Sequence, residues 1–165
     1  MLKNYLSEIM FSRLALGIFV IVMFLITGIA KQSPASTFMT LATSKLKLPN
    51  GRVVAMEIAD TPEERAQGLS GRVSLPESTA MLFVFSEEGY YSLWMANMRF
   101  AIDIIWLDSD YQVVDIAQYV QPLSNVASNQ LPRYTNREPA QYVLEVNAGF
   151  SASNQLDRGD KIQLT

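Results

Sequence analysis

Two carboxylates lie within otherwise apolar segments of the chain, and they are the side chains best placed to carry chemistry. Asp103 lies in the segment 100–106, and Glu145 is the one charged residue in the segment 142–146. A buried carboxylate requires a charged partner or several hydrogen-bond donors, or else it binds a proton. Two such acids at one site would support general acid–base catalysis or bind a hard divalent cation. Sequence spacing leaves open whether these two candidate catalytic residues meet.

Asp103 has a structural and a functional interpretation. In the structural one it forms an ion pair or ties down a loop, and in the functional one it binds a ligand or transfers a proton. Because its neighbours are apolar on both sides, we expect Asp103 to be buried, ionised and paired with an arginine. Arg72 is the expected partner, since it follows a glycine in a loop that can reach across a sheet, while Arg65 and Arg99 are the alternatives.

The segment Trp94-Met95-Ala96-Asn97 is a second candidate site. The amide of Asn97 could orient a ligand beside the aromatic wall of Trp94, and on a strand Met95 and Asn97 would share a face. The alternative is core packing for Trp94 and a turn at the strand end for Asn97. The candidate ligand-binding residues are therefore Arg72, Trp94, Met95, Asn97, Asp103 and Glu145.

The composition excludes several classes of protein. The 165 residues include no Cys and no His, which excludes disulfide scaffolds, thiol nucleophiles, Ser–His triads and His/Cys zinc sites. With 13 basic against 16 acidic residues and no basic block, a nucleic-acid partner is not expected. No phosphate loop, dinucleotide fingerprint or EF-hand is present, so we predict no cofactor and assign no metal ligand.

An uncharged apolar segment near the N-terminus, residues 14–30, predicts a helix about 26 Å long. Lys3 and Arg13 precede it, which favours a cytoplasmic N-terminus. Residues 1–30 are therefore either a signal peptide or an uncleaved membrane anchor, and residues 31–44 are a linker. Either alternative places the following domain outside the cytoplasm, in the periplasm or at the cell surface, and the uncleaved form also has the membrane as a partner.

The sequence pattern over residues 45–165 predicts a single, mainly β domain. Alternating and β-branched segments separated by turn residues indicate short strands, and Thr61-Pro62-Glu63-Glu64 begins a helix over 61–68. A second short helical segment is expected near 150–156. We predict a compact antiparallel β-barrel-like or sandwich domain with one or two short helices. A parallel sheet is not expected, because the gaps between strands lack crossover helices. Strands are predicted at 45–48, 52–59, 81–85, 91–95, 101–107, 111–116, 141–146 and 161–164.

A series of short motifs over residues 53–165 resembles the domain of unknown function 192 family, also called uncharacterised protein family 0127. The resemblance implies a mostly antiparallel β-barrel-like fold, often exported behind a hydrophobic segment, and carries no established activity. The matching motifs, in the family's order, are Glu64-Arg65-Ala66-Gln67-Gly68-Leu69, Gly71-Arg72, Leu75, Met81-Leu82-Phe83-Val84-Phe85, Trp94-Met95-x-Asn97, Ile102-Asp103-Ile104-Ile105, Tyr142-Val143-Leu144-Glu145, Gly149 and Gly159-Asp160.

Two functions follow from these observations. The favoured one is a non-catalytic module of the cell envelope that binds a small molecule or an envelope protein through the region of Trp94 and Asn97. The alternative is a carboxylate-based enzyme using Asp103 and Glu145, with or without a divalent cation. The absence of His and Cys removes the commonest catalytic side chains and favours the binding module.

Overall fold

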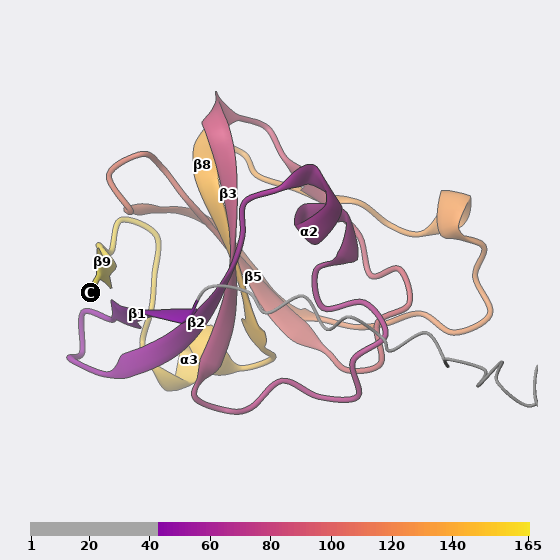
Figure 1. Ribbon diagram of the computed structural model, residues 1–165, viewed down its shortest axis with the longest axis horizontal. Coiled ribbons are helices and arrows are strands. Elements are labelled where there is room, and N and C mark those ends of the chain that lie inside the picture. The colour runs from indigo at the N-terminus through magenta and orange to yellow at the C-terminus, as the bar shows by residue number, and fades with distance from the viewer. Residues whose placement is uncertain (1–42) are drawn as a thin grey trace, which may run out of the picture. The chain divides into compact units, whose positions relative to one another are not determined.

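The computed structural model describes residues 43–165, which are mostly β-strand (Figure 1). The predicted signal peptide or anchor over 1–30 lies outside the described residues. Strand β1 begins at Thr43 and so includes the last residues of the predicted linker 31–44. The elements are β1 (Thr43–Lys47), β2 (Val53–Ala59), α2 (Pro62–Gln67), β3 (Thr79–Gly89), β4 (Ser92–Leu93), β5 (Ile102–Leu107), β6 (Val113–Val120), the 3₁₀ turn η1 (Ser128–Gln130), β7 (Tyr134–Thr135), β8 (Ala140–Asn147), α3 (Phe150–Ser153) and β9 (Gln163–Leu164).

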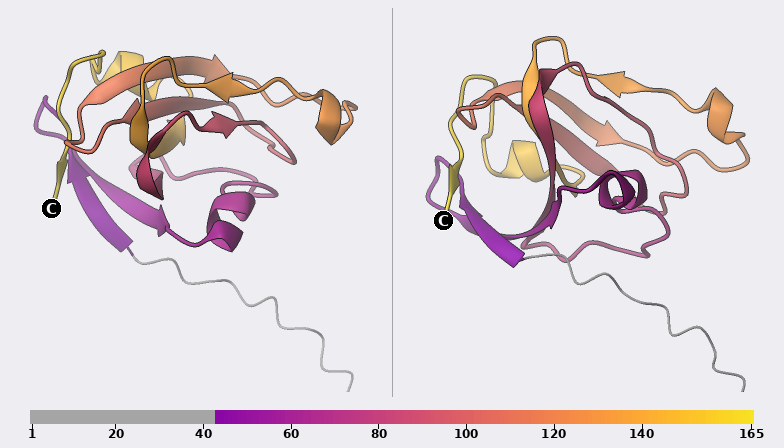
Figure 2. Two further views of the ribbon diagram at one scale, coloured as in Figure 1. Left: turned by 90° about the horizontal axis from the view of Figure 1, so that it is seen from above. Right: turned by 45° about the horizontal axis from the view of Figure 1, so that its top comes forward.

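Seven strands form one sheet in the order β6-β5-β8-β3-β2-β1-β9, and β4 pairs with β7 separately. The large sheet curls into a half-barrel, as the turned views in Figure 2 show. The chain after α3 joins the two edges of this curl, because Val113 N donates to Asp160 O at 2.8 Å and Ile162 N donates to Tyr111 O at 3.0 Å. The predicted mainly β class with two short helices is confirmed.

One strand pair contradicts the prediction of a purely antiparallel sheet. Strands β2 and β3 run parallel, with Ala55 opposite Thr79 and Ala59 opposite Phe83. A parallel pair needs a long crossover connection, and here the segment containing α2 provides it. The predicted helix is present, but its role as a crossover depends on which strands pair, and that is decided by tertiary packing.

Helix α2 forms where its capping residues predict it. Thr61 Oγ1 accepts a hydrogen bond from Glu64 N, and the Glu64 side chain accepts one from Thr61 N, which completes a capping box. Gly68 ends the helix with φ 46°, and a Cβ there would lie 3.0 Å from the Phe83 ring. Glycine is thus required both for the backbone conformation and for the close approach of α2 to β3.

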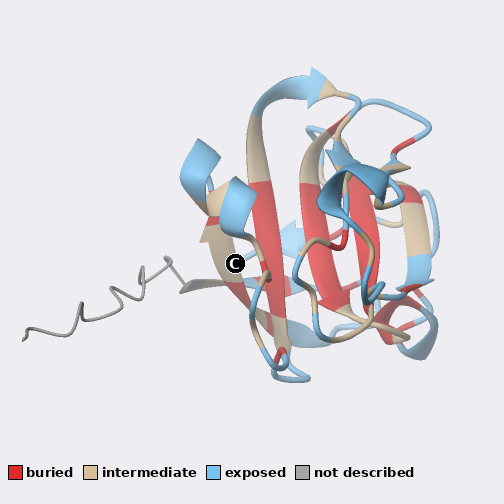
Figure 3. Ribbon diagram, turned by 90° about the vertical axis from the view of Figure 1, so that its right-hand side faces the viewer, coloured by how far each residue is buried: buried red, intermediate tan, exposed pale blue. Residues whose placement is uncertain are grey.

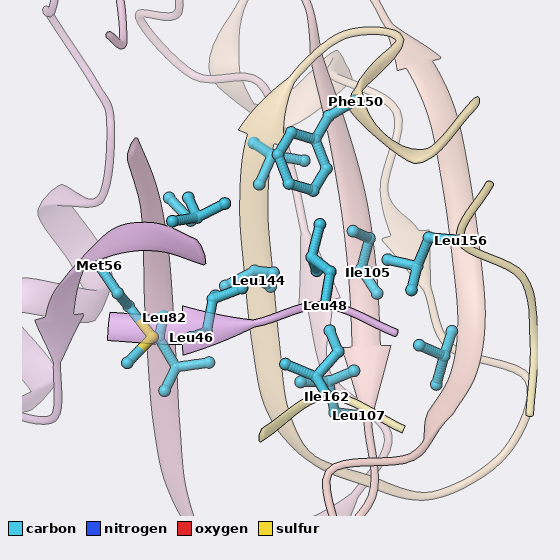
Figure 4. Packing of buried hydrophobic residues seen from close by; sticks show 14 residues of the cluster. Leu46, Leu48, Met56, Leu82, Ile105, Leu107, Leu144, Phe150, Leu156 and Ile162 are labelled. Atoms are coloured by element: carbon cyan, nitrogen blue, oxygen red, sulfur yellow. The ribbon is translucent and has the colours of Figure 1, made fainter. Parts of the chain in front are cut away.

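Both faces of the central strands are buried, which explains why all six residues of β5 are buried (Figure 3). The concave face of the half-barrel holds one apolar cluster, which includes Leu46, Met56, Ile105 and Leu144 (Figure 4). The opposite face holds a second cluster around Trp106 and is covered by α2 and the loops that follow it. The site described below lies on this second face.

Within residues 43–165, no helix has the length and apolar character needed to cross a bilayer.

Candidate ligand pocket

The segments that cover the second face of the sheet leave a cavity of about 260 Å³ between α2, β3 and the chain around β4. Its wall is mainly aromatic and aliphatic. The rings of Phe85 and Tyr91 stack there with centroids 3.6 Å apart. We call this cavity the aromatic pocket. Its apolar wall residues include Leu69, Phe83, Phe85, Tyr91, Leu93, Trp94 and Met98.

Glu145 lines the aromatic pocket from the centre of the sheet. It lies on β8 between Met81 of β3 and Ile104 of β5, and only 7% of its surface is exposed. No hydrogen bond from residues 43–165 reaches its carboxyl group. Burial raises the pKa of Glu145 to about 8, and the nearby positive charge of Arg72 opposes this only in part. At neutral pH Glu145 is therefore mostly protonated, with a hydroxyl able to donate a hydrogen bond to a ligand.

Arg72 pairs with Glu57, and not with Asp103 as predicted. Its Nη1 and Nη2 donate to Glu57 Oε1 and Oε2 at 2.8 and 2.7 Å, and this bond raises the pKa of Arg72. Glu57 of β2 lies opposite Met81 of β3, which is itself opposite Glu145, so both acids lie in one row on the same face. Arg72 thus supports the pocket from outside and does not line it.

Asp103 is fully buried, but its partners are backbone amides. Its Oδ1 accepts from Tyr119 N at 2.9 Å and Gly149 N at 3.1 Å, and its Oδ2 accepts from Ser151 N at 2.9 Å. The prediction of burial is confirmed and the prediction of an arginine partner is wrong. Three donors offset the cost of burying the carboxylate, so no countercharge is required. This geometry supports the structural interpretation, in which Asp103 ties down a loop.

The two candidate catalytic acids do not share a site. In the β5–β8 register Glu145 lies opposite Ile104, whereas Asp103 lies opposite Val146. Directly opposed residues share a face and successive residues alternate, so Asp103 and Glu145 project from opposite faces of the sheet. Within the described part of the chain no group of three or more His, Cys, Asp or Glu could hold a metal ion. Chemistry that needs both carboxylates has no geometric support.

The segment 94–97 is a turn and not the predicted strand. Strand β4 ends at Leu93, Met98 N donates to Met95 O, and Asn97 has φ 56°. Met95 is buried in the core, while Trp94 lines the aromatic pocket. Asn97 instead lines a neighbouring cavity of about 560 Å³, which is open and mainly polar and which we call the polar cavity. The alternation assumed for a strand therefore does not apply to these residues.

Comparison with known proteins places the chain in a family. The family model DUF192, described as Uncharacterized ACR, matches residues 45–164. The chain belongs to the DUF192 family. It is 28% identical over 127 residues to a UPF0127 protein of Thermococcus kodakarensis, a match that covers 77% of this chain and 73% of that protein. It is 32% identical over 109 residues to a UPF0127 protein of Thermococcus gammatolerans, of whose length it spans 64%.

Two solved structures resemble this DUF192 domain. A Sinorhizobium meliloti protein described as a candidate transcription regulator aligns with a TM-score of 0.67 and 30% identity, covering 75% of this chain and 95% of the other. A protein of unknown function from Novosphingobium aromaticivorans aligns with a TM-score of 0.65 and 27% identity, covering 74% and 84%. Both agree with the mainly β half-barrel described here for the DUF192 domain.

Several residues of the aromatic pocket in this DUF192 domain are not among the ligand-binding residues that the sequence predicts. Phe83 and Phe85 are two apart on β3, so they share a face, and with Glu145 they mark the pocket wall. Their two-residue spacing within a predicted strand is the sequence signal for this wall. The sequence predicts Arg65 only as an alternative partner of Asp103, whereas in the structure Arg65 lines the aromatic pocket. Its position depends on how α2 packs against β3, which the sequence pattern does not specify.

The ion pair beside the pocket gives a first prediction. Arg72→Met is expected to lower the free energy of unfolding by about 1 kcal/mol, because the pair is only partly buried. A double-mutant cycle with Glu57→Gln should show a coupling of about 0.5–1.5 kcal/mol in urea unfolding. The same cycle with Asp103→Asn should be additive. Coupling of Arg72 to Asp103 with none to Glu57 would contradict this assignment.

Proposed function

We propose that this DUF192 domain is a non-catalytic binding module for a small, largely apolar molecule that occupies the aromatic pocket. The observation that carries the proposal is Glu145, a buried acid that lines an apolar cavity without a hydrogen-bond partner from residues 43–165. A cavity with mainly apolar walls, a few polar groups and an acid of perturbed pKa is typical of a binding site. The cavity is at the small end for such sites, which favours a compact ligand.

The protonation state of Glu145 indicates which polar group the ligand presents. Since its pKa is raised to about 8, the carboxyl is mainly a hydrogen-bond donor at neutral pH. A ligand carbonyl or hydroxyl oxygen would accept that hydrogen bond between the mainly apolar walls of the cavity. The ligand would thereby supply the partner that the protein does not.

A matched pair of compounds tests this proposal. We expect butyrophenone, an aromatic ketone, to bind at pH 6.5 about tenfold more tightly than butylbenzene, which lacks the carbonyl. The affinity for the ketone should fall as the pH rises through 8 and Glu145 loses its proton. The affinity of Glu145→Gln, whose amide still donates, should stay constant with pH. Isothermal titration calorimetry measures these affinities, and Trp94 fluorescence should report the same binding.

One control variant identifies the source of the fluorescence response. In Trp94→Phe the fluorescence response should disappear while the calorimetric affinity persists, because the other tryptophan, Trp106, lies in the core. Equal affinities for ketone and hydrocarbon in every variant, or no binding by either, would contradict a ligand role for Glu145. Turnover of a bound compound that Glu145→Gln abolishes would favour the catalytic alternative.

We further propose that the module acts outside the cytoplasm, on the evidence of the apolar segment 14–30 and the preceding Lys3 and Arg13. A reporter enzyme that is active only outside the cytoplasm, fused after Leu48, is expected to be active. The matched control deletes residues 14–30 from the same fusion and should be inactive. Equal activity of the two fusions, or silence of both, would contradict export by this segment.

A further inference from the structure

The charges around the two cavities differ in sign from the charge of the domain. Residues 43–165 carry ten Lys and Arg side chains against fifteen Asp and Glu. Among these residues, the charged side chains that line either cavity are Arg65, Arg99 and Glu145. Glu145 is mostly neutral at pH 7 because burial raises its pKa. The site is therefore locally cationic on an acidic domain, which favours an anionic ligand.

Arg65 is held in place within the aromatic pocket. Its Nη1 donates to Asp60 O and, at 2.9 Å, to Val84 O, and its guanidinium lies 5.3 Å from the centroid of the Phe85 ring. Residues 43–165 provide no acceptor for its Nε or Nη2. A guanidinium fixed in this way and retaining free N–H groups is preorganised to bind a carboxylate.

The aromatic faces argue against a cationic ligand. Phe85 already has Arg65 near its ring and Tyr91 stacked on it. Arg133 lies 4.3 Å from the centroid of the Trp94 ring. Protein cations thus already use the two rings that would best bind a ligand ammonium group. A ligand cation would also meet the positive charge of Arg65 inside the same pocket.

The polar cavity continues the aromatic pocket toward a second arginine. The two cavities share Ala66, Gln67, Ser70 and Met98 in their walls. Arg99 lines the polar cavity and forms no ion pair with any residue in the described range 43–165. Its charge adds to the attraction of an anion at the junction of the two cavities.

We infer that the ligand of the aromatic pocket is an organic acid, whose anionic group pairs with Arg65 and whose apolar body lies against Phe83, Phe85 and Trp94. This inference rests on the proposed function and names the class of ligand. It also gives different roles to Arg65 and Glu145, the two ionisable residues that line the pocket. Arg65 holds the acid group, and Glu145 donates to a neutral oxygen such as a keto group.

Three compounds that share one body test the inference in calorimetric titrations of the full chain at pH 6.5. They are butyrophenone, 3-benzoylpropanoate, in which a carboxylate replaces the terminal methyl group, and 3-(dimethylamino)propiophenone, in which a cationic amine does. We expect the acid to bind about tenfold more tightly than the ketone, and the amine to bind more weakly than both. The advantage of the acid should shrink as salt is added.

Substitutions of single arginines test which side chain binds the carboxylate of the acid. Arg65→Lys keeps the charge but loses the planar fork, and it should reduce the advantage of the acid severalfold. Arg99→Gln, at an exposed site, should reduce it about twofold to threefold and tests the cationic field without disturbing α2. Arg158→Gln, outside both cavities, is the control and should leave it unchanged. The quantity compared between variants is the ratio of the affinity for the acid to the affinity for the ketone, and Arg158→Gln should leave the affinity for the neutral ketone unchanged as well.

The outcomes separate this inference from the proposed function. Equal affinities for ketone and acid, or tighter binding of the amine, would overturn the organic-acid inference while the binding module stands. An acid advantage that is undiminished in both Arg65→Lys and Arg99→Gln would also overturn it. Failure of all three compounds to bind contradicts the proposed function itself.

Discussion

Asp103→Ala is expected to lower the free energy of unfolding by about 4 kcal/mol, and Asp103→Asn by about 2 kcal/mol. The alanine variant leaves the N–H groups of Tyr119, Gly149 and Ser151 without their acceptor. Tyr119 and Gly149 adopt φ 54° and 82°, so Asp103 also holds two residues in the left-handed region. Asparagine keeps one acceptor oxygen and loses the other, which explains its intermediate effect.

Urea unfolding followed by circular dichroism measures this difference. The matched control is Asp108→Asn, because Asp108 Oδ1 also accepts two backbone N–H groups, from Asp110 and Gln112, but in an exposed turn. The control should lose no more than about 1 kcal/mol, since water replaces the missing acceptor. A loss at Asp103 no larger than at Asp108, or a gain in stability, would indicate a strained functional carboxylate and contradict the structural assignment.

Glu145→Gln is expected to raise the free energy of unfolding above pH 8 by roughly 4–5 kcal/mol relative to the natural chain, with little difference at pH 4.5. Burial raises the pKa of Glu145 from 4.5 to about 8 in the folded protein. Between these values the folded state binds a proton that the unfolded state has released, so stability falls as the pH rises. The penalty is complete once the pH exceeds the folded pKa, and glutamine never incurs it.

The composition leaves few other groups that could contribute to the pH dependence of stability. The chain has no His and no Cys, so among ordinary groups only the α-amino terminus titrates between pH 5 and 8. Glu63→Gln, on the exposed side of α2, is the control and should leave the pH dependence of stability unchanged. Parallel stability profiles for the natural chain and Glu145→Gln from pH 5 to 9 would show that Glu145 is not protonated at neutral pH.

Local signals in the sequence predicted the elements well. The capping residues Thr61, Pro62 and Glu64 placed α2, and the apolar neighbours of Asp103 correctly indicated a strand buried on both faces. The turn at 108–110 is also present, with Asp108 accepting backbone hydrogen bonds. These features depend on residues close together in the chain, which is why sequence pattern suffices for them.

Partners that are distant in the chain could not be predicted in the same way. The donors to Asp103 come from residues 16, 46 and 48 positions away and are backbone groups, which leave no trace in side-chain pattern. The parallel pairing of β2 with β3 likewise depends on packing of α2 over the sheet. Of the candidate ligand-binding residues, the aromatic pocket contains Trp94 and Glu145, and the polar cavity contains Asn97. Arg72 and Met95 lie outside both cavities, and Asp103 ties down a loop on the opposite face of the sheet.

The most direct test of the account is a pH titration of the Glu145 carboxyl carbon by NMR, with Glu145→Gln used to assign the signal. We expect a midpoint at about pH 8 in the free protein, since burial raises the pKa. Saturation with butyrophenone should move the midpoint upward, because the ketone accepts a hydrogen bond only from the protonated acid. A midpoint near the ordinary value of 4.5, or one that the bound ketone leaves unchanged, would contradict a neutral Glu145 that donates to a ligand in the aromatic pocket.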